Sequence, residues 1–173
     1  VELLGPRTRP IVKLSIDGSQ LVAGGQSIQR IELQTQFDSS LPADAPIQLT
    51  ALVDKLQLTG YQIDGNLQLQ GTPGDARLNV SLIEAGQGEI QLLSRGGLAN
   101  GTLSATIEQL VLNHPQAGKW EARPGAELTI REDAGELSLA CLQRKDASVC
   151  GASTWQRQRV DARMNIKSLR LES

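Results

Sequence analysis

Apolar and polar residues alternate along most of the chain. Val12, Leu14 and Ile16, for example, are separated by Lys13 and Ser15. A period of two is typical of a β-strand that turns one face toward apolar surroundings and the other toward water. Turn signals rich in Gly, Asn and Asp separate successive runs at short intervals. The pattern predicts an all-β chain of about a dozen antiparallel strands joined by short hairpins.

The alternation changes phase once in a strongly patterned stretch. Leu103, Ala105 and Ile107 follow one phase, whereas Leu110 and Leu112 follow the other. A single extra residue in one strand has this effect on the side-chain pattern. We therefore expect a β-bulge near Glu108.

One side of the predicted strands carries Leu, Ile and Val, and the other carries Gln, Ser, Thr, Asp and Arg. A sheet with one apolar face is covered by a second sheet, by closure into a barrel, or by an apolar molecule from outside. The residues alone leave a β-sandwich and a hydrophobic groove open. The positions predicted to line the apolar face are Leu14, Ile16, Leu33, Leu49, Leu67, Leu69, Leu78, Val80, Leu82, Ile90, Leu92, Leu103, Ile107, Leu128, Ile130, Leu137 and Leu139.

The composition narrows the range of functions. Among 173 residues only Trp120, Trp155, Tyr61 and Phe37 are aromatic, and the formal net charge is −2. Single-stranded nucleic acids are bound by stacked rings and basic grooves, so nucleic acid is not an expected partner. Aliphatic side chains without rings suit an adaptable hydrophobic channel, although they also fill a plain sandwich.

Candidate catalytic chemistry is sparse. His114 is the only histidine, which removes most metal and acid–base constellations. The sequence contains no Gly-x-Ser-x-Gly elbow, phosphate-binding loop or Cys-x-x-Cys pair. His114 precedes a proline and is interpreted as a turn residue. We expect a protein that is not an enzyme and that has no cofactor or metal.

Targeting signals are not evident in the chain. No stretch approaches the roughly 20 consecutive apolar residues of a transmembrane helix, and the first residues lack the layout of a signal peptide. The chain also begins without Met. We therefore expect a fragment of a longer protein. No composition shift or linker rich in Pro and Ser divides the chain, so one continuous β-rich domain is expected over residues 1–173.

Two cysteines, Cys141 and Cys150, flank a polar, turn-prone segment. Two strands folding back through this segment would place the sulfurs opposite each other. A disulfide there implies an oxidising compartment. The alternative is a pair of reduced thiols in a cytosolic hairpin.

Four segments near the C-terminus carry a family resemblance. Residues 118–124 (GKWEARP) and 126–130 (AELTI) are followed by 135–142 (GELSLACL) and 149–155 (VCGASTW). This succession of a glycine–tryptophan strand, a proline-led strand, a Cys-Leu strand end and a Cys-to-Trp strand resembles the interior of the TamB family. The upstream strands match that family only in pattern.

The resemblance implies a fold, a function and a location. TamB-like proteins are AsmA-like bridges of the translocation and assembly module, anchored in the inner membrane and reaching the outer-membrane barrel protein TamA. Their periplasmic part is a long curved antiparallel sheet, a β-taco, around an apolar groove linked to phospholipid transport between the membranes and to assembly of outer-membrane proteins. This chain would be an interior segment in the periplasm of a Gram-negative bacterium. The anchoring and TamA-docking regions would lie outside it.

Two partners are then expected for the groove. Phospholipid acyl chains would line the Leu, Ile and Val face, or the groove and its sheet edge would receive β-strands of client barrel proteins. A basic cluster near the C-terminus is interpreted as a solvated outer face or protected edge, with contact to anionic head groups as the alternative. The cluster comprises Arg157, Arg159, Arg163, Lys167 and Arg170.

Overall fold

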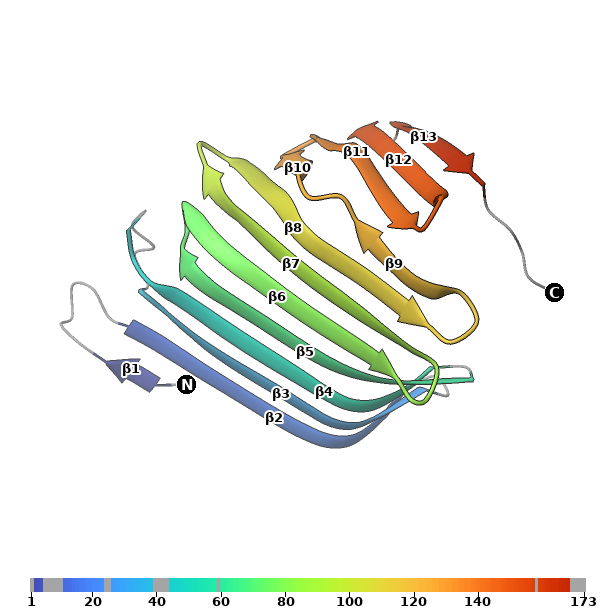
Figure 1. Cartoon of the computed structure of the whole chain (residues 1–173). Coiled ribbons are helices and arrows are strands. Elements are labelled where there is room, and N and C mark those ends of the chain that lie inside the picture. The colour runs from blue at the N-terminus through green and yellow to red at the C-terminus, as the bar shows by residue number, and fades with distance from the viewer. Residues whose placement is uncertain are drawn as a thin grey trace.

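The computed structural model describes residues 2–4, 11–23, 26–38, 44–58, 60–157 and 159–168. Within them the chain is all-β and forms one antiparallel sheet of 13 strands (Figure 1). The strands are β1 (Glu2–Leu4), β2 (Ile11–Ala23), β3 (Gln26–Asp38), β4 (Ile47–Leu58), β5 (Tyr61–Thr72), β6 (Asp75–Glu84), β7 (Gly88–Ala99), β8 (Thr102–His114), β9 (Gly118–Ala122), β10 (Ala126–Arg131), β11 (Ala134–Arg144), β12 (Ala147–Gln156) and β13 (Arg159–Lys167).

Each strand pairs with the next one along the chain, as the hairpin pattern predicts, except around β9 and β10. These two short strands occupy a single strand position end to end, because both pair with β8 on one side and with β11 on the other. The residues between the two strands still form backbone hydrogen bonds with the neighbouring strands. Arg123 N donates to Cys141 O at 2.9 Å, and Gly125 N donates to Ile107 O at 3.0 Å. Pro124, which has no backbone donor, stands at the break.

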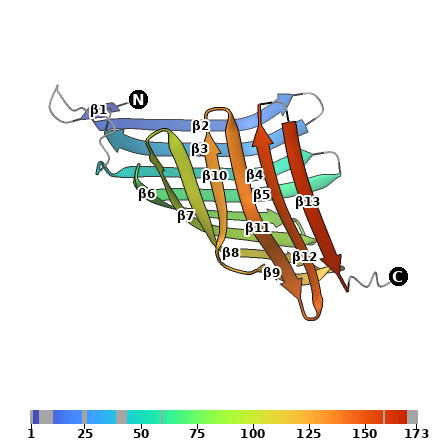
Figure 2. The same ribbon diagram turned by 90° about the horizontal axis from the view of Figure 1, so that it is seen from above.

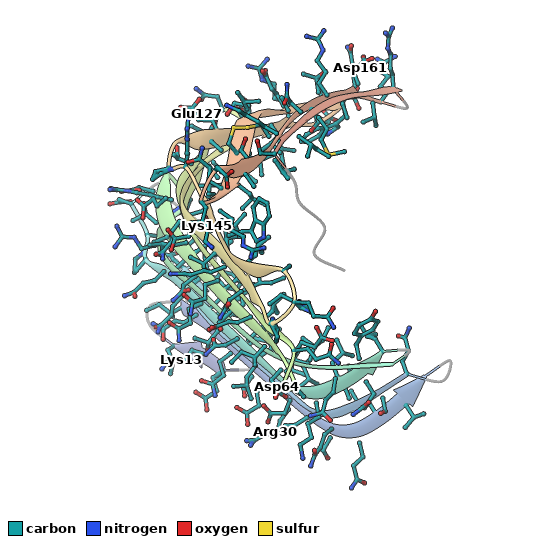
Figure 3. The ribbon with its side chains drawn as sticks, turned by 45° about the vertical axis from the view of Figure 1, so that its right-hand side comes forward. Lys13, Arg30, Asp64, Glu127, Lys145 and Asp161 are labelled. Atoms are coloured by element: carbon teal, nitrogen blue, oxygen red, sulfur yellow. A yellow bond between two sulfur atoms is a disulfide. The ribbon has the colours of Figure 1, made fainter. Side chains whose placement is uncertain are left out.

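The sheet curves into an open C (Figure 3). Lys13, Arg30, Glu127 and Asp161 lie on its convex side. Directly opposed residues of antiparallel strands share a face, so the register assigns the polar positions to the convex face and the alternating apolar positions to the concave face. Seen from above, β10–β13 cross over β2–β5 at a steep angle, which shows how far the sheet twists (Figure 2).

Extra residues in single strands bend the sheet. The register of β7 and β8 shifts between Leu93 and Ser94, with Glu108 as the extra residue, so the bulge predicted near this position is confirmed. A second shift, between β4 and β5, lies at Lys55, whose φ is 47° and whose backbone N donates to Asp64 Oδ1 at 2.7 Å. Each bulge increases the local twist and bend of its strand.

A further register shift, between β11 and β12, separates the pairs Leu137↔Ser153 and Ala140↔Gly151. The shift lies at the same level along the strands as the Glu108 bulge and the β9–β10 interruption, because β8, β10 and β11 are neighbours in the sheet there. Three adjacent strand positions thus lose regular pairing at one level. This line of irregular pairing separates the regular pairs of β8 with β10 from those of β8 with β9.

No second layer covers the concave face in the described residues. Among the residues that the structure describes, only Ala45, Ala126, Cys141 and Ser94 are buried, and no large side chain is fully enclosed. The chain exposes 12259 Å², whereas a compact monomer of 18.6 kDa exposes about 8,200 Å². In the described part of the chain, substantial contacts between elements occur only between strands that pair. The described structure is therefore a single curved sheet and not a β-sandwich.

One close approach involves a glycine. Gly135 on β11 and Trp155 on β12 are directly opposed. A β-carbon at position 135 would overlap the six-membered ring of the Trp155 indole. The indole therefore occupies the space that a side chain at position 135 would need, at the end of the sheet that carries β13.

Candidate functional site

The candidate site is the concave face, formed by alternate residues of every strand from β2 to β13. Its central ladder runs across four strands, where Ala51 opposes Leu67, Leu67 opposes Val80, and Val80 opposes Leu92. The register places nearly all of the predicted lining on this face. These residues are Leu14, Ile16, Leu33, Leu49, Leu67, Leu69, Leu78, Val80, Leu82, Ile90, Leu92, Leu103, Ile107, Leu128, Ile130 and Leu137.

Leu139 is the exception, and its predicted place on the apolar face is wrong. The β11 bulge adds a residue between Leu137 and Ala140, which both belong to the concave face. The alternation therefore slips, and Leu139 points to the convex side with 65% of its surface exposed. An isolated bulge of this kind reverses every downstream assignment made by counting residues.

The concave side chains are half-buried by their neighbours within the sheet and are open on the side away from it. Leu69 lies between Leu49 and Leu78 in the ladder. Ile16 is 47% exposed, and Leu103 is 40% exposed. A continuous aliphatic surface of this extent exceeds what a soluble monomer ordinarily leaves in water.

Charged side chains on the concave face are confined to one place in the described strands. Glu84, which ends β6, and Arg144, which ends β11, are the charged members of the inward-facing rows, and the single histidine, His114, ends β8 between them. We call Glu84, His114 and Arg144 the polar lip. All three are half-buried.

Glycines make room for the polar lip. The position that a β-carbon would take at Gly88 is 3.4 Å from His114 Cδ2 and 4.0 Å from Glu84 Oε2. The corresponding position at Gly118 is 2.8 Å from Arg144 Nε. The three side chains therefore lie over the backbone of β7 and β9, on either side of β8.

Sequence reasoning missed the polar lip, although part of the signal was present. Glu84 continues the phase of Leu78, Val80 and Leu82, which identifies a charge at an inward position. His114 likewise continues the phase of the second half of its strand. Arg144 is inward only because of the β11 bulge.

The convex face carries the other charge clusters. Arg77 and Arg95 are directly opposed on β6 and β7. Arg95 binds the Asp75 carboxylate through two hydrogen bonds, and Arg77 Nε lies 3.7 Å from Glu108. The hydrogen bond from Arg95 lowers the pKa of Asp75 below its ordinary value and raises the pKa of Arg95.

Much of the predicted basic cluster also lies on the convex face. Arg159, Arg163 and Lys167 project from the outer side of β13, where Arg159 Nε lies 3.1 Å from Asp161 Oδ2. Arg157 lies in the turn before β13, 3.5 Å from Asp133. Arg170 lies outside the described residues. A hollow of about 540 Å³ is mostly lined by polar residues of this end of the convex face, such as Thr129, Glu136 and Thr154, and not by the apolar residues of the concave face.

The cysteines form a disulfide. Cys141 and Cys150 are directly opposed on β11 and β12, so the sulfurs meet across the hairpin. Both side chains lie on the convex side, and Cys141 is buried. The predicted pairing is confirmed. The bond fixes the register of the hairpin on the far side of the β11 bulge.

Comparison with protein-family models, with curated proteins and with solved structures found no match to this chain. The described residues contain no helix long and apolar enough to cross a membrane. They also contain no group of three or more metal-ligating side chains.

Proposed function

We propose that this chain is a segment of a periplasm-spanning bridge of the TamB family, and that its concave face carries phospholipid acyl chains between the inner and outer membranes. The bridge also supports assembly of outer-membrane proteins. The single observation that carries the proposal is the continuous aliphatic surface of β2–β13, which no second layer covers in the described residues.

The physical chemistry of an acyl chain suits this surface. Each methylene removed from water contributes about 0.8 kcal/mol, and the Leu, Ile and Val ladder offers apolar contact at every strand it crosses. Van der Waals contact with branched aliphatic side chains is not directional, so a chain slides without losing specific bonds. No covalent step is needed, and the segment is proposed to act without enzymatic activity.

The proposed location agrees with the covalent chemistry of the chain. A disulfide between Cys141 and Cys150 persists in the periplasm, where thiols are kept oxidised. We place the segment in the periplasmic part of a single-pass inner-membrane protein, with TamA contacted by regions outside this chain.

Site-specific photo-crosslinking tests the proposal. A photoreactive residue is placed at Leu69 or Val80, on the concave face, and as matched controls at Gln68 or Gln70, on the convex face of the same region. Lipid adducts identified by mass spectrometry are expected from the concave pair alone. Equal labelling of both faces would contradict the proposal.

An alternative function is supported by the ends of the sheet. In the described part of the chain, two edges of the sheet have no strand partner: the edge of β13 that faces away from β12, and the edge of β2 that faces away from β3 over residues 14–23. Such an edge receives an added strand through backbone hydrogen bonds. The alternative is a chaperone that binds strands of barrel proteins, and crosslinks from Asn165 on β13 to unfolded barrel proteins, in place of lipid adducts from Val80, would favour it.

A further inference from the structure

We infer that the polar lip holds the head group of a zwitterionic phospholipid with a primary amine: Arg144 and His114 bind the phosphate, and Glu84 binds the ammonium. This inference rests on the proposed function and adds a head-group preference to it. The occupant is identified by charge, since the lip offers one cation and one anion, and the other inward-facing residues of the described strands are uncharged.

The distribution of charge is the first argument. Charged side chains within an apolar surface cost free energy unless they are paired or functional. In the inward-facing rows of the described strands, Glu84 and Arg144 come from β6 and β11, which are far apart in sequence, yet they lie at the same end of the sheet. A ligand with a charged head and apolar chains needs this arrangement: a charged site at the end of an aliphatic surface.

The spacing of the two charges is the second argument. The Glu84 carboxylate lies over β7 and the Arg144 guanidinium over β9, and two strand spacings correspond to about 10 Å. They form no ion pair with each other, and neither has another salt-bridge partner in the described residues. The gap leaves room for a group that bears both opposite charges.

The free hydrogen-bonding atoms are the third argument. His114 Nδ1 accepts from Gln116 N at 3.2 Å and from Ala117 N at 3.4 Å, so the proton of the neutral ring is assigned to Nε2. Arg144 Nη1 donates to Ala117 O at 2.7 Å, which orients the guanidinium and leaves its other N–H groups available. These donors suit phosphate oxygens, whereas the acceptor-only carboxylate of Glu84 suits an ammonium group.

Trp120 adds a boundary between the polar and apolar parts of this site. Its ring belongs to the concave face beside Leu112, and its Nε1 donates to Ala117 O at 2.9 Å. An indole whose N–H is hydrogen-bonded and whose ring lies on an apolar surface is typical of the interface between lipid head groups and acyl chains.

The test compares lipids with identical acyl chains by native mass spectrometry of the full chain in detergent micelles. The probes are phosphatidylethanolamine, phosphatidylcholine, phosphatidylglycerol and diacylglycerol. The wild-type protein is expected to bind the ethanolamine lipid at least about fivefold more tightly than the others, because charge-assisted hydrogen bonds form at both ends of its head group.

Two variants separate the roles of the lip. Glu84→Gln is expected to remove the preference for ethanolamine over choline. Arg144→Gln is expected to weaken all three phospholipids about tenfold while leaving diacylglycerol binding unchanged. Glu136→Gln and Arg163→Gln change the same charges on the convex face and are expected to match the wild type.

The outcomes distinguish the inference from the function on which it rests. Equal binding of all four lipids by the wild type, or lip variants that behave like the convex controls, would overturn the head-group site and leave the proposed lipid conduit intact. Failure to bind any lipid, diacylglycerol included, would overturn both. Far-ultraviolet circular dichroism of each variant checks that the strands remain folded.

Discussion

Arg95 on β7 holds Asp75 on β6 through two parallel hydrogen bonds, with Nε donating to Oδ1 at 2.6 Å and Nη2 donating to Oδ2 at 2.5 Å. Arg77 lies directly opposite Arg95, and like charges in that position repel. The carboxylates of Asp75 and Glu108 offset this repulsion on the convex face.

The Asp75–Arg95 pair predicts a pH-dependent contribution to stability. The pKa of Asp75 is lower in the folded protein than its ordinary value of 3.8, so the pair stabilises the fold above that value and loses its effect as pH falls through the folded pKa. Asp75→Asn is expected to be less stable than wild type at about pH 6, and the difference is expected to shrink as the pH falls below 3.8 and through the lowered pKa of Asp75. Urea unfolding midpoints measured across this range check the prediction, and a pH-independent difference would contradict it.

Gly135→Ala tests the contact between β11 and β12. The added methyl group would overlap the Trp155 indole and is expected to cost about 1–3 kcal/mol of unfolding free energy through overpacking. Gly151→Ala is the matched control on the same face, because the nearest atom, Arg163 O, is 3.7 Å from the new carbon. Its effect is expected to stay within about 1 kcal/mol. Similar losses in both variants would argue against the indole position.

Reduction of the Cys141–Cys150 disulfide is expected to destabilise the sheet without abolishing its strands. Closure of a loop with a sequence separation of 9 contributes on the order of 2–3 kcal/mol by restricting the unfolded chain. Guanidinium unfolding with and without reductant measures the difference. The double variant Cys141→Ser, Cys150→Ser should match the reduced protein and should not respond to reductant.

Leu137 and Leu139 provide a test of the β11 bulge. Leu137→Asp places a charge in the aliphatic concave face and is expected to cost about 1–3 kcal/mol. Leu139→Asp places the same charge on the convex face, where Leu139 is 65% exposed, and is expected to change the unfolding free energy by less than about 0.5 kcal/mol. Without the bulge the two substitutions would have equal effects, and comparison of their urea midpoints decides between these cases.

The all-β class, the antiparallel neighbours, the Glu108 bulge and the disulfide were predictable, because each depends on local alternation or on two residues facing across a hairpin. The bulges in β4 and β11 were not. At Lys55 in β4, the extra residue is accommodated by a left-handed backbone conformation and by a hydrogen bond to the Asp64 side chain, and this contact is known only once the register is known. The β11 bulge leaves no break in the alternation of Leu137 and Leu139, so Leu139 was assigned to the wrong face.

The candidate site was predictable in its apolar part and not in its polar part. Leu69 and Val80 follow simple alternation, so their face was correctly assigned. The polar lip depends on three strand ends meeting at one end of the sheet, and Arg144 reaches it from β11 across β9. Such a convergence depends on strand order and on the interruption between β9 and β10, which composition and periodicity do not encode.

The single-layer pairing gives the chain a modular length. Because the substantial contacts between elements of the described structure join strands that are neighbours in the sheet, stability is nearly a sum of local terms, as in repeat proteins. Every added antiparallel hairpin would lengthen the concave surface by about 10 Å and leave the distant strands unchanged. The length of the concave surface along the curve of the sheet is thus set by the number of hairpins. Insertion or deletion of whole hairpins would change this length without changing the aliphatic character of the surface that an apolar ligand contacts.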